Sequence, residues 1–383
     1  MTSERYPIFM LTLICMLSIS AGCEPKETVS SKPLVRLGEF SSLTGREAGL
    51  GQYTHMGVLL ALEELNAAGG VLGRPIEVIA EDTQSKAGEA VTATRKLVSR
   101  DHVVALIGEG ASGRCLEGAP IAQENHIPLV TPAATNPRVT ELGDYIFRVC
   151  FTDPFQGTVM AKFARESLHV RRVGVLVDVA SPYSVGLAEF FRQRFLADGG
   201  EIVAEQKFSG GDKDFRAQLT TIKAAKPDAI FAPSYYGDAG LILLQARQLG
   251  ITVPFLGGDG YEAPELVQVA GAAADGAYFP VHFSLDSTEA RSREFVRKFT
   301  ARFQKPPTGV SALGYDALML LADAMRRANS TDGPAVRAAL AATRDFAGVT
   351  GRIAMDAGRN AQKSAAIIRV EGGRFQFVQT VAP

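Results

Sequence analysis

Tryptophan is absent from this sequence, so any aromatic contact to a ligand must come from phenylalanine or tyrosine. Lysine and arginine total 40 against 41 aspartate and glutamate, which argues against a nucleic-acid-binding protein, because such a protein shows a basic excess. The four cysteines include no CxxC pair and no Cys/His cluster. We therefore expect no metal and no nucleic-acid partner.

Long hydrophobic runs are also missing, since no segment approaches the roughly 18 consecutive apolar residues of a membrane-spanning helix. Residues 8–19 (IFMLTLICMLSI) form a shorter apolar run, which small residues and then Cys23 follow. This pattern is typical of a secretory signal, and its final cysteine makes it resemble a bacterial lipoprotein signal. We predict a signal peptide at 1–22 and a polar tether at 23–33, with lipid on Cys23. A plain secretory signal, in which Cys23 is incidental, is the alternative.

The cysteines that would remain in the exported protein are Cys115 and Cys150. An oxidising compartment permits a disulfide between them. Two buried free thiols are the other possibility, because sequence spacing does not place their Cα atoms within bridging distance.

The length of 383 residues suggests two or three domains, and 46% apolar residues suffice for sizeable cores. Short β-type runs alternate with helical patterns from residue 34 onward, which indicates βαβ units and parallel sheets. Strands are expected at 35–40, 75–80, 103–107, 127–130, 173–177, 202–206, 229–232 and 254–256. Helices are expected at 51–66, 87–100, 113–124, 155–167, 184–197, 215–225, 240–249 and 264–269.

The predicted βαβ units are too many for one open sheet of usual width. We therefore expect two similar α/β lobes, with a break near 152–154. Three further helices (288–303, 311–327 and 333–342) and terminal strands within 351–381 complete both lobes. The predicted lobes are 34–153 plus 284–347 for the N-terminal lobe, and 154–283 plus 348–383 for the C-terminal lobe. The chain then crosses between lobes more than once, and a ligand would lie in the cleft between them.

One motif suggests a dinucleotide enzyme, because 108–113 (GEGASG) is a formal GxGxxG. It follows the third predicted strand rather than the first, and the next strand ends without an acidic residue for a ribose. The five histidines are scattered, and Ser112 lacks a GxSxG frame because Arg114 stands in it. We expect no cofactor and no enzyme activity. The start of a helix after this loop would still bind a carboxylate.

Several short motifs match a known family in their order and spacing. They are S-x-T-G at 42–45, ELNAAGGVLGRPIEV at 64–78, TPAAT at 131–135, FR at 147–148, DPFQG at 153–157, YSVGL at 183–187 and LGGDG at 256–260. With them the chain resembles the periplasmic leucine/isoleucine/valine-binding proteins of ABC importers. The resemblance implies the type I periplasmic binding protein fold, α/β with two doubly wound parallel-sheet lobes, three interlobe crossovers and a ligand cleft.

The resemblance also implies a set of ligand contacts in the cleft. Ser112 matches the serine that holds the ligand carboxylate, and Ala133 matches a carbonyl that accepts from the ammonium. Thr135 matches the threonine that contacts both groups, and Asp259 stands where an acidic residue pairs with the ammonium. Further cleft contacts match Tyr183, Tyr235 and, at the ligand side chain, Leu50.

The chemistry of these residues suits a zwitterion, which needs donors at one end and a charged acceptor at the other. We expect Arg114 either to contact the ligand or to lie on the solvated rim of the cleft. Contact with the ligand would favour a ligand that carries a second carboxylate. We expect a monomeric, lipid-anchored periplasmic protein that delivers a branched-chain or other small amino acid to permease subunits. A ligand-sensing receptor module, or a binder of amides, urea or aromatic acids with this fold, is the alternative.

Overall fold

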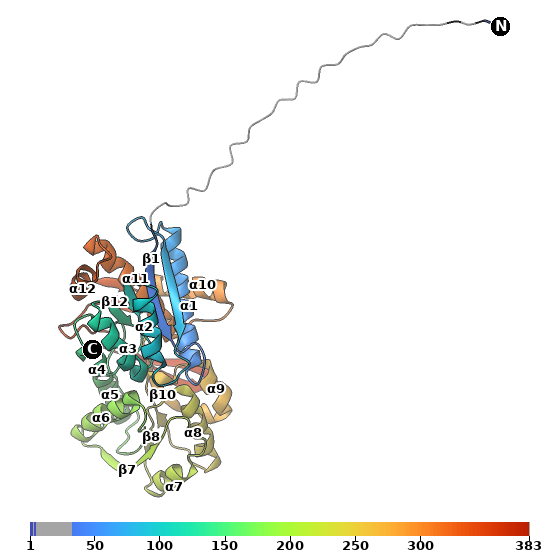
Figure 1. The fold of residues 1–383 in the computed structure, drawn as a ribbon. Helices are drawn as coiled ribbons and strands as arrows, with labels where there is room; N and C mark the ends of the chain where they lie inside the picture. Colours follow the sequence, from blue (N-terminus) through green and yellow to red (C-terminus); the bar gives the residue numbers. More distant parts are fainter. Residues whose placement is uncertain (3, 5–32, 383) are drawn as a thin grey trace. The chain divides into compact units, whose positions relative to one another are not determined.

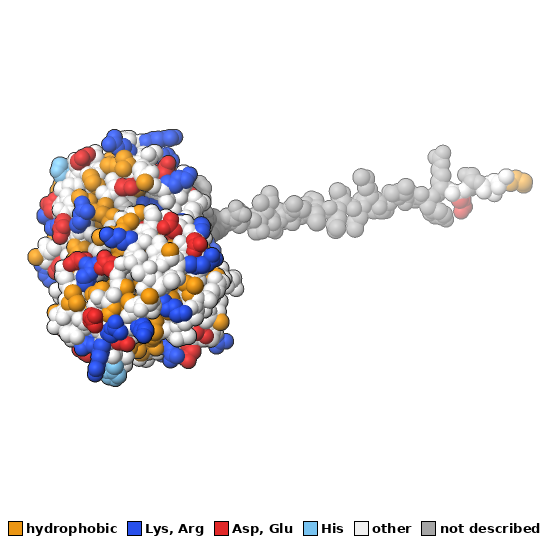
Figure 2. Space-filling model, turned by 90° about the horizontal axis from the view of Figure 1, so that it is seen from below, with side chains coloured by type: hydrophobic (Ala, Val, Ile, Leu, Met, Phe, Trp, Pro, Cys, Tyr) orange, Lys and Arg blue, Asp and Glu red, His pale blue; other side chains and the backbone are white. Residues whose placement is uncertain are grey.

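The computed structural model describes residues 1–2, 4 and 33–382, and the account below concerns 33–382. Cys23, with the signal peptide and most of the tether predicted around it, lies outside the described residues. Among the described residues, no helix has both the length and the apolar character needed to cross a bilayer. On the face shown in Figure 2, basic and acidic side chains are interspersed rather than separated into fields of one sign.

The first lobe is built on a sheet of five parallel strands in the order β2-β1-β3-β4-β5. Its strands are β1 (Val35–Ser41), β2 (Ile76–Asp82), β3 (Ala105–Ile107), β4 (Leu129–Thr131) and β5 (Ile146–Arg148). Its helices are α1 (Ala48–Ala67), α2 (Glu89–Ser99), α3 (Ser112–Glu124) and α4 (Arg138–Glu141). Three later helices complete it, α10 (Ala290–Phe303), α11 (Gly309–Ala328) and α12 (Gly333–Ala341), and α11 packs along α1.

The second lobe has a seven-stranded sheet in the order β14-β13-β10-β9-β8-β6-β7. Five strands are parallel: β6 (Arg172–Asp178), β7 (Glu201–Phe208), β8 (Ala229–Phe231), β9 (Phe255–Leu256) and β10 (Ala277–Val281). β13 (Ala365–Glu371) and β14 (Arg374–Val381) add an antiparallel edge. The helices are α5 (Asp153–Lys162), which continues as a π-helical turn at Phe163–Ser167, α6 (Pro182–Ala197), α7 (Arg216–Ala224), α8 (Tyr236–Gln248) and α9 (Pro264–Ala270).

The chain passes between the lobes after β5, after β10 and before β13. Figure 1 shows β1, α1 and α11 in the upper lobe and β7, α7 and α8 in the lower one. The predicted fold class, two α/β lobes joined by three crossovers, is therefore confirmed. Because parallel strands present their carboxyl-end loops at one edge, residues that follow β3, β4, β8 and β9 can meet between the lobes.

The residue limits of the two lobes stay a prediction. The contacts of residues 346–361 bear on one of these limits, the point where the last passage between the lobes begins. β11 (Phe346–Gly348) and β12 (Gly351–Ile353) form a two-stranded sheet, and β11 contacts α11. Farther on, Arg359 donates to the Thr140 carbonyl at 2.7 Å. We propose that the last passage between lobes begins after Ala361 rather than near 347.

In the two large sheets, two strands were not expected from the sequence, β5 and β10, and the short β11 outside them was not expected either. Three residues are too few to show an alternation, which hides β5. β10 contains Pro280, which lacks an N–H and lowers the strand signal of its segment. Both strands lead directly into crossovers, so they matter for the site.

Candidate functional site

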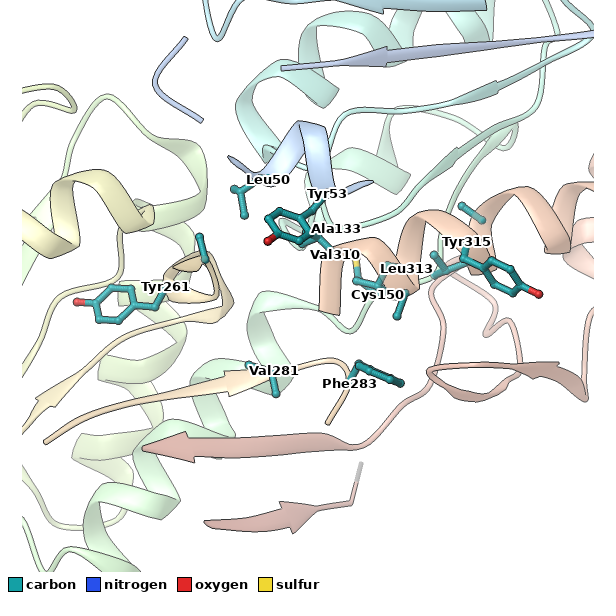
Figure 3. Packing of buried hydrophobic residues seen from close by; sticks show 14 of the residues in the cluster. Leu50, Tyr53, Ala133, Cys150, Tyr261, Val281, Phe283, Val310, Leu313 and Tyr315 are labelled. Carbon is teal, nitrogen blue, oxygen red and sulfur yellow. The ribbon is translucent and has the colours of Figure 1, made fainter. Parts of the chain in front are cut away.

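A small cavity lies between the lobes at the carboxyl ends of the strands. It is lined by Leu50, Gly110, Ala133, Tyr183, Tyr235, Asp259, Gly260 and Val310. Figure 3 shows Val310 at the start of α11 and Leu50 at the start of α1, with Ala133, which follows β4, near Val310. The volume of about 20 Å³ is room for roughly one water molecule, so the lobes are closed upon each other.

A larger hollow of about 680 Å³ lies beside the second and third crossovers, and it contains none of the predicted site residues. The small cavity is the better candidate because its walls combine apolar side chains, helix starts and one carboxylate. These are the features of a selective small-molecule site.

On the first lobe, the cavity is faced by helix starts that have no caps of their own. The residues before α1 and α3 are Glu47 and Ala111, and neither side chain accepts a hydrogen bond from its helix. The first amides of a helix point outward without intrahelical partners, and the helix dipole adds positive potential there. In α1 the amides of residues 48–51 already have hydrogen-bond partners. The start of α3 is therefore the part of this wall that offers donors to an anion.

Ser112 and Thr135 lie just behind the lining. Both are about 1% exposed. The Ser112 hydroxyl oxygen accepts from the Asn136 amide at 3.2 Å. The Thr135 hydroxyl oxygen has no hydrogen-bond partner in the described part of the chain. An unpaired buried hydroxyl is costly, and this one is close enough to Asp153 to oppose the rise of that carboxyl's pKa. Thr135 can therefore donate to Asp153 or to a ligand that reaches it.

On the second lobe, Asp259 forms the polar centre of the site. Its Oδ1 accepts from the Tyr183 hydroxyl at 2.9 Å, and its Oδ2 lies 2.9 Å from His282 Nε2. Its backbone amide donates to Gln156 Oε1 at 3.3 Å. Each carboxylate oxygen can accept more than one hydrogen bond, so both retain capacity for a ligand cation.

His282 is buried, stacked on Phe151 with ring centres 3.6 Å apart. Burial lowers the pKa of His282, so the ring is neutral near pH 7. A neutral ring beside a carboxylate donates from the nitrogen nearest to it, so Nε2 carries the proton and Nδ1 is bare. His282 therefore orients Asp259 by a hydrogen bond and adds no positive charge to the site.

The two cavity tyrosines stack with ring centres 5.1 Å apart. Burial raises the pKa values of Tyr183 and Tyr235 well above the usual range, so both stay protonated. The Tyr183 hydroxyl donates to Asp259 and accepts from the Gly260 amide at 3.1 Å. The two hydroxyls make the second-lobe wall of the cavity polar on the side that faces the first lobe.

A second buried carboxyl, Asp153, begins α5 where the first crossover enters the second lobe. Burial, with the charge of Asp259 adding to it, raises the pKa of Asp153 to about 7. Two carboxylates near one cavity make that region favourable for a cation.

The glycine loop after β3 holds a carboxyl group of its own. Glu109 is 1% exposed, and its Oε2 accepts from the hydroxyls of Ser42 at 3.1 Å and Thr83 at 2.7 Å. Burial raises the pKa of Glu109 to about 7. Such a group disfavours a pyrophosphate, in agreement with rejecting the dinucleotide interpretation of this loop.

Arg114 does not line the cavity, and its side chain is largely buried. It forms an ion pair with the fully buried carboxylate of Glu47 and donates to the Ser85 carbonyl at 2.8 Å. Its charge is therefore satisfied inside the first lobe. Cys115 and Cys150 are free, buried thiols, and burial raises both pKa values to about 12.

Five of the seven predicted ligand-binding residues line the cavity. They are Leu50, Ala133, Tyr183, Tyr235 and Asp259. Ser112 and Thr135 are next to it, and the binding roles of all seven stay predictions. Sequence reasoning missed Val310, Gln156 and His282. Val310 follows a glycine at a helix start, which was a usable signal, whereas the other two lie in no motif.

Comparison with known proteins bears on this site. A family model described as "Periplasmic binding protein" matches residues 34–374. The leucine-binding protein LivK of Thermotoga maritima shares 40% identity at a TM-score of 0.88, over 91% of this chain and 99% of that one. The branched-chain amino acid transporter substrate-binding protein LivJ of Streptococcus pneumoniae, solved with isoleucine, shares 36% at 0.87, over 92% and 100%.

A curated relative is the leucine-, isoleucine-, valine-, threonine- and alanine-binding protein of Pseudomonas aeruginosa. It is 29% identical over 326 residues, which cover 84% of this chain and 86% of the relative. All three relatives are named for binding rather than for catalysis. In the described part of the chain, no group of three or more His, Cys, Asp or Glu side chains is placed to hold a metal ion.

Proposed function

Since the chain belongs to the periplasmic binding protein family, we propose that it binds a small amino acid with an apolar side chain for an ABC importer. The family works outside the cytoplasm. The lobes separate about the three crossovers, admit the ligand and close on it, and the closed form is recognised by permease subunits. The protein acts as a monomer.

The observation that carries this proposal is the opposition of charge types across the cavity. On the first lobe, the uncapped start of α3 follows Gly110 of the cavity lining, and the buried Thr135 hydroxyl lies behind Ala133. The oriented carboxylate of Asp259 faces the cavity from the second lobe. A zwitterion would place its carboxylate on the first side and its ammonium on the second. Leu50 and Val310 would contact an apolar side chain.

A thermal-shift screen against amino acids, amides and aromatic acids tests the ligand class. A ligand at 100 times its Kd adds about 2.7 kcal/mol to the free energy of unfolding. We expect leucine, isoleucine or valine to raise Tm. The deaminated analogue 4-methylpentanoate, which has no ammonium, should bind poorly. A shift with benzoate but none with amino acids would contradict the proposal.

Asp259 provides the matching variant. Asp259→Asn keeps the shape of the side chain and removes its charge, so affinity should fall roughly tenfold to a hundredfold by calorimetry. The control is Asp323→Asn, on the surface of α11 in an ion pair with Arg327. Wild-type affinity in Asp259→Asn would mean that the ligand places no cation there.

We also propose that Cys23 carries a lipid anchor, on the evidence of its sequence alone. Cys23→Ser should release the protein from the membrane fraction or leave the precursor unprocessed. Unchanged fractionation of this variant would leave a plain secretory signal as the better account.

A further inference from the structure

The first helix amides of one lobe are hydrogen-bonded by side chains of the other. At α11, the Gly309 amide of the first lobe donates to Glu262 Oε1 of the second at 2.6 Å. At α1, the Gly49 amide donates to the Tyr236 hydroxyl at 2.9 Å. Because the partners of each bond belong to different lobes, both bonds exist only while the lobes are closed.

The Glu262 contact lies directly behind the cavity without forming part of its lining. Glu262 comes three residues after Asp259, and Gly309 precedes Val310, and both Asp259 and Val310 line the cavity. The bond therefore ties together two segments that would contact a ligand. Any change in it acts through the position of these segments rather than through ligand contact.

The surroundings of Glu262 make this bond costly to lose in the closed form. The residue is 7% exposed, and its Oε2 has no partner in the described part of the chain. A carboxyl group at this depth needs a hydrogen bond, and the start of a 20-residue helix supplies one together with its dipole. When the lobes separate, water can replace both partners.

The space at Gly309 is limited by the interlobe contact and not by its own backbone, so a side chain there would force the buried Glu262 carboxyl to shift. The φ of Gly309 lies outside the left-handed region, since it is not among the glycines with positive φ. A Cβ atom placed there would come within 2.4 Å of Glu262 Oε2. Alanine would suit the helix itself, so a methyl group at this position would act only when the lobes close.

We propose that Glu262 is a positioning residue for closure, whose carboxyl group caps α11 across the interlobe boundary and thereby sets how tightly the closed form holds its ligand. The ligand-affinity readout rests on the proposed function, whereas the closure itself does not. Tyr236 on α1 is a second, weaker contact of the same kind. Arg46 and Asp238, 3.8 Å apart, add an outer charge contact between the same lobes.

Gly309→Ala is the decisive variant. The proposal requires that ligand-free wild type samples the closed form, which this bond stabilises. Gly309→Ala should therefore have a larger radius of gyration than wild type by small-angle X-ray scattering without ligand, with unchanged far-UV circular dichroism and at least tenfold weaker leucine binding. The loss should lie in faster dissociation, since the open form still admits ligand. Gly237→Ala is the matched control, because Gly237 also lies in the first turn of a helix and its Cβ would meet nothing within 4 Å.

A double-mutant cycle in leucine affinity distinguishes loss of the Glu262–Gly309 contact from nonspecific destabilisation of the protein. Glu262→Ala removes the carboxyl that the new methyl group would meet, so Gly309→Ala should have little further effect in that background. Glu262→Gln keeps an acceptor for the Gly309 amide, so leucine affinity should stay within about threefold of wild type.

Equal radius and equal affinity in Gly309→Ala and wild type would overturn the proposal, and so would additive losses in the cycle. If no amino acid binds the wild-type protein, the proposed function is rejected, but the proposal about closure is not. The scattering comparison of the ligand-free proteins then decides on the closure contact, and equal radii reject it.

Discussion

The two walls of the cavity are built from different material. The first lobe presents the backbone of its loops and helix starts, with small or apolar side chains, as at Gly110, Ala133 and Val310. The second lobe presents side-chain oxygens, as at Tyr183 and Asp259. One wall is therefore made by the shape of the backbone, and the other by the identity of individual residues.

This difference determines how each wall can be changed. A main-chain amide survives every substitution except proline, so the first wall is altered only through whatever holds its loops in place. A side-chain oxygen can be removed alone, so the second wall can be dissected residue by residue. A substitution that disturbs the first wall should therefore cause a large loss of stability, and single substitutions in the second wall should cause smaller losses of ligand affinity.

The largest expected effect is at Arg148, which holds the loop that carries Ala133. Its buried guanidinium donates to the carbonyl of Ala134 at 2.7 Å and to that of Asn136 at 2.8 Å. Arg148→Met leaves these carbonyls unpaired, and the free energy of unfolding should fall by about 3 kcal/mol or more. Urea denaturation would measure the loss.

Two further variants sharpen that test. Lysine lacks the planar fork, so Arg148→Lys should not restore the stability. Arg138→Met, on the exposed face of α4, should change it by less than about 0.5 kcal/mol. If Arg148→Met were as stable as Arg138→Met, the first wall would not depend on this scaffold.

Glu109 is an exception to the comparison, since it is a side-chain carboxyl inside the backbone-built wall. Its pKa of about 7 in the folded protein exceeds the usual 4.5, so the folded state keeps a proton that the unfolded state loses. Wild-type stability should therefore fall as pH rises from about 4.5 to 7.

Glu109→Gln cannot titrate and should gain stability relative to wild type across this pH window. The gain is at most about 3.5 kcal/mol, at about 1.4 kcal/mol per unit of pKa. Denaturation at pH 5 and at pH 8 would measure it. A constant difference at the two pH values would show that Glu109 is ionised throughout.

The smallest expected effect is at Tyr183, on the wall made of separate side chains. Tyr183→Phe removes one donor to Asp259 and leaves His282 in place. Ligand affinity should fall by fivefold to thirtyfold, which corresponds to about 1–2 kcal/mol. Tyr145→Phe, in the first lobe and outside the cavity lining, is the control. Complete loss of binding would show that the side chains of the second wall do not contribute separately to ligand affinity.

The backbone-built wall was the more predictable from sequence. The helix expected at 113–124 is observed at Ser112–Glu124, and the strand expected at 35–40 is observed at Val35–Ser41. Local patterns of apolar residues, glycines and helix starts are enough to place such elements, and helix starts at strand ends are what forms this wall.

The supporting contacts of the other wall could not be predicted. His282, Gln156 and Glu262 meet partners that are 23, 103 and 47 residues away in the sequence. No periodicity encodes such pairs, because they arise only when the sheet order and the crossovers are known. Asp259 was identified from its motif, but its orientation by His282 depends on β10, a strand that the sequence did not reveal.

The stacked rings of Tyr183 and Tyr235 have a practical consequence. With no tryptophan in the chain, its near-ultraviolet absorption and emission come from tyrosine. Two of those rings touch each other and line the cavity. A ligand that enters must change their spacing or their contact with water. The protein therefore carries its own optical reporter of occupancy, and one tryptophan introduced elsewhere would serve as an energy-transfer acceptor for it.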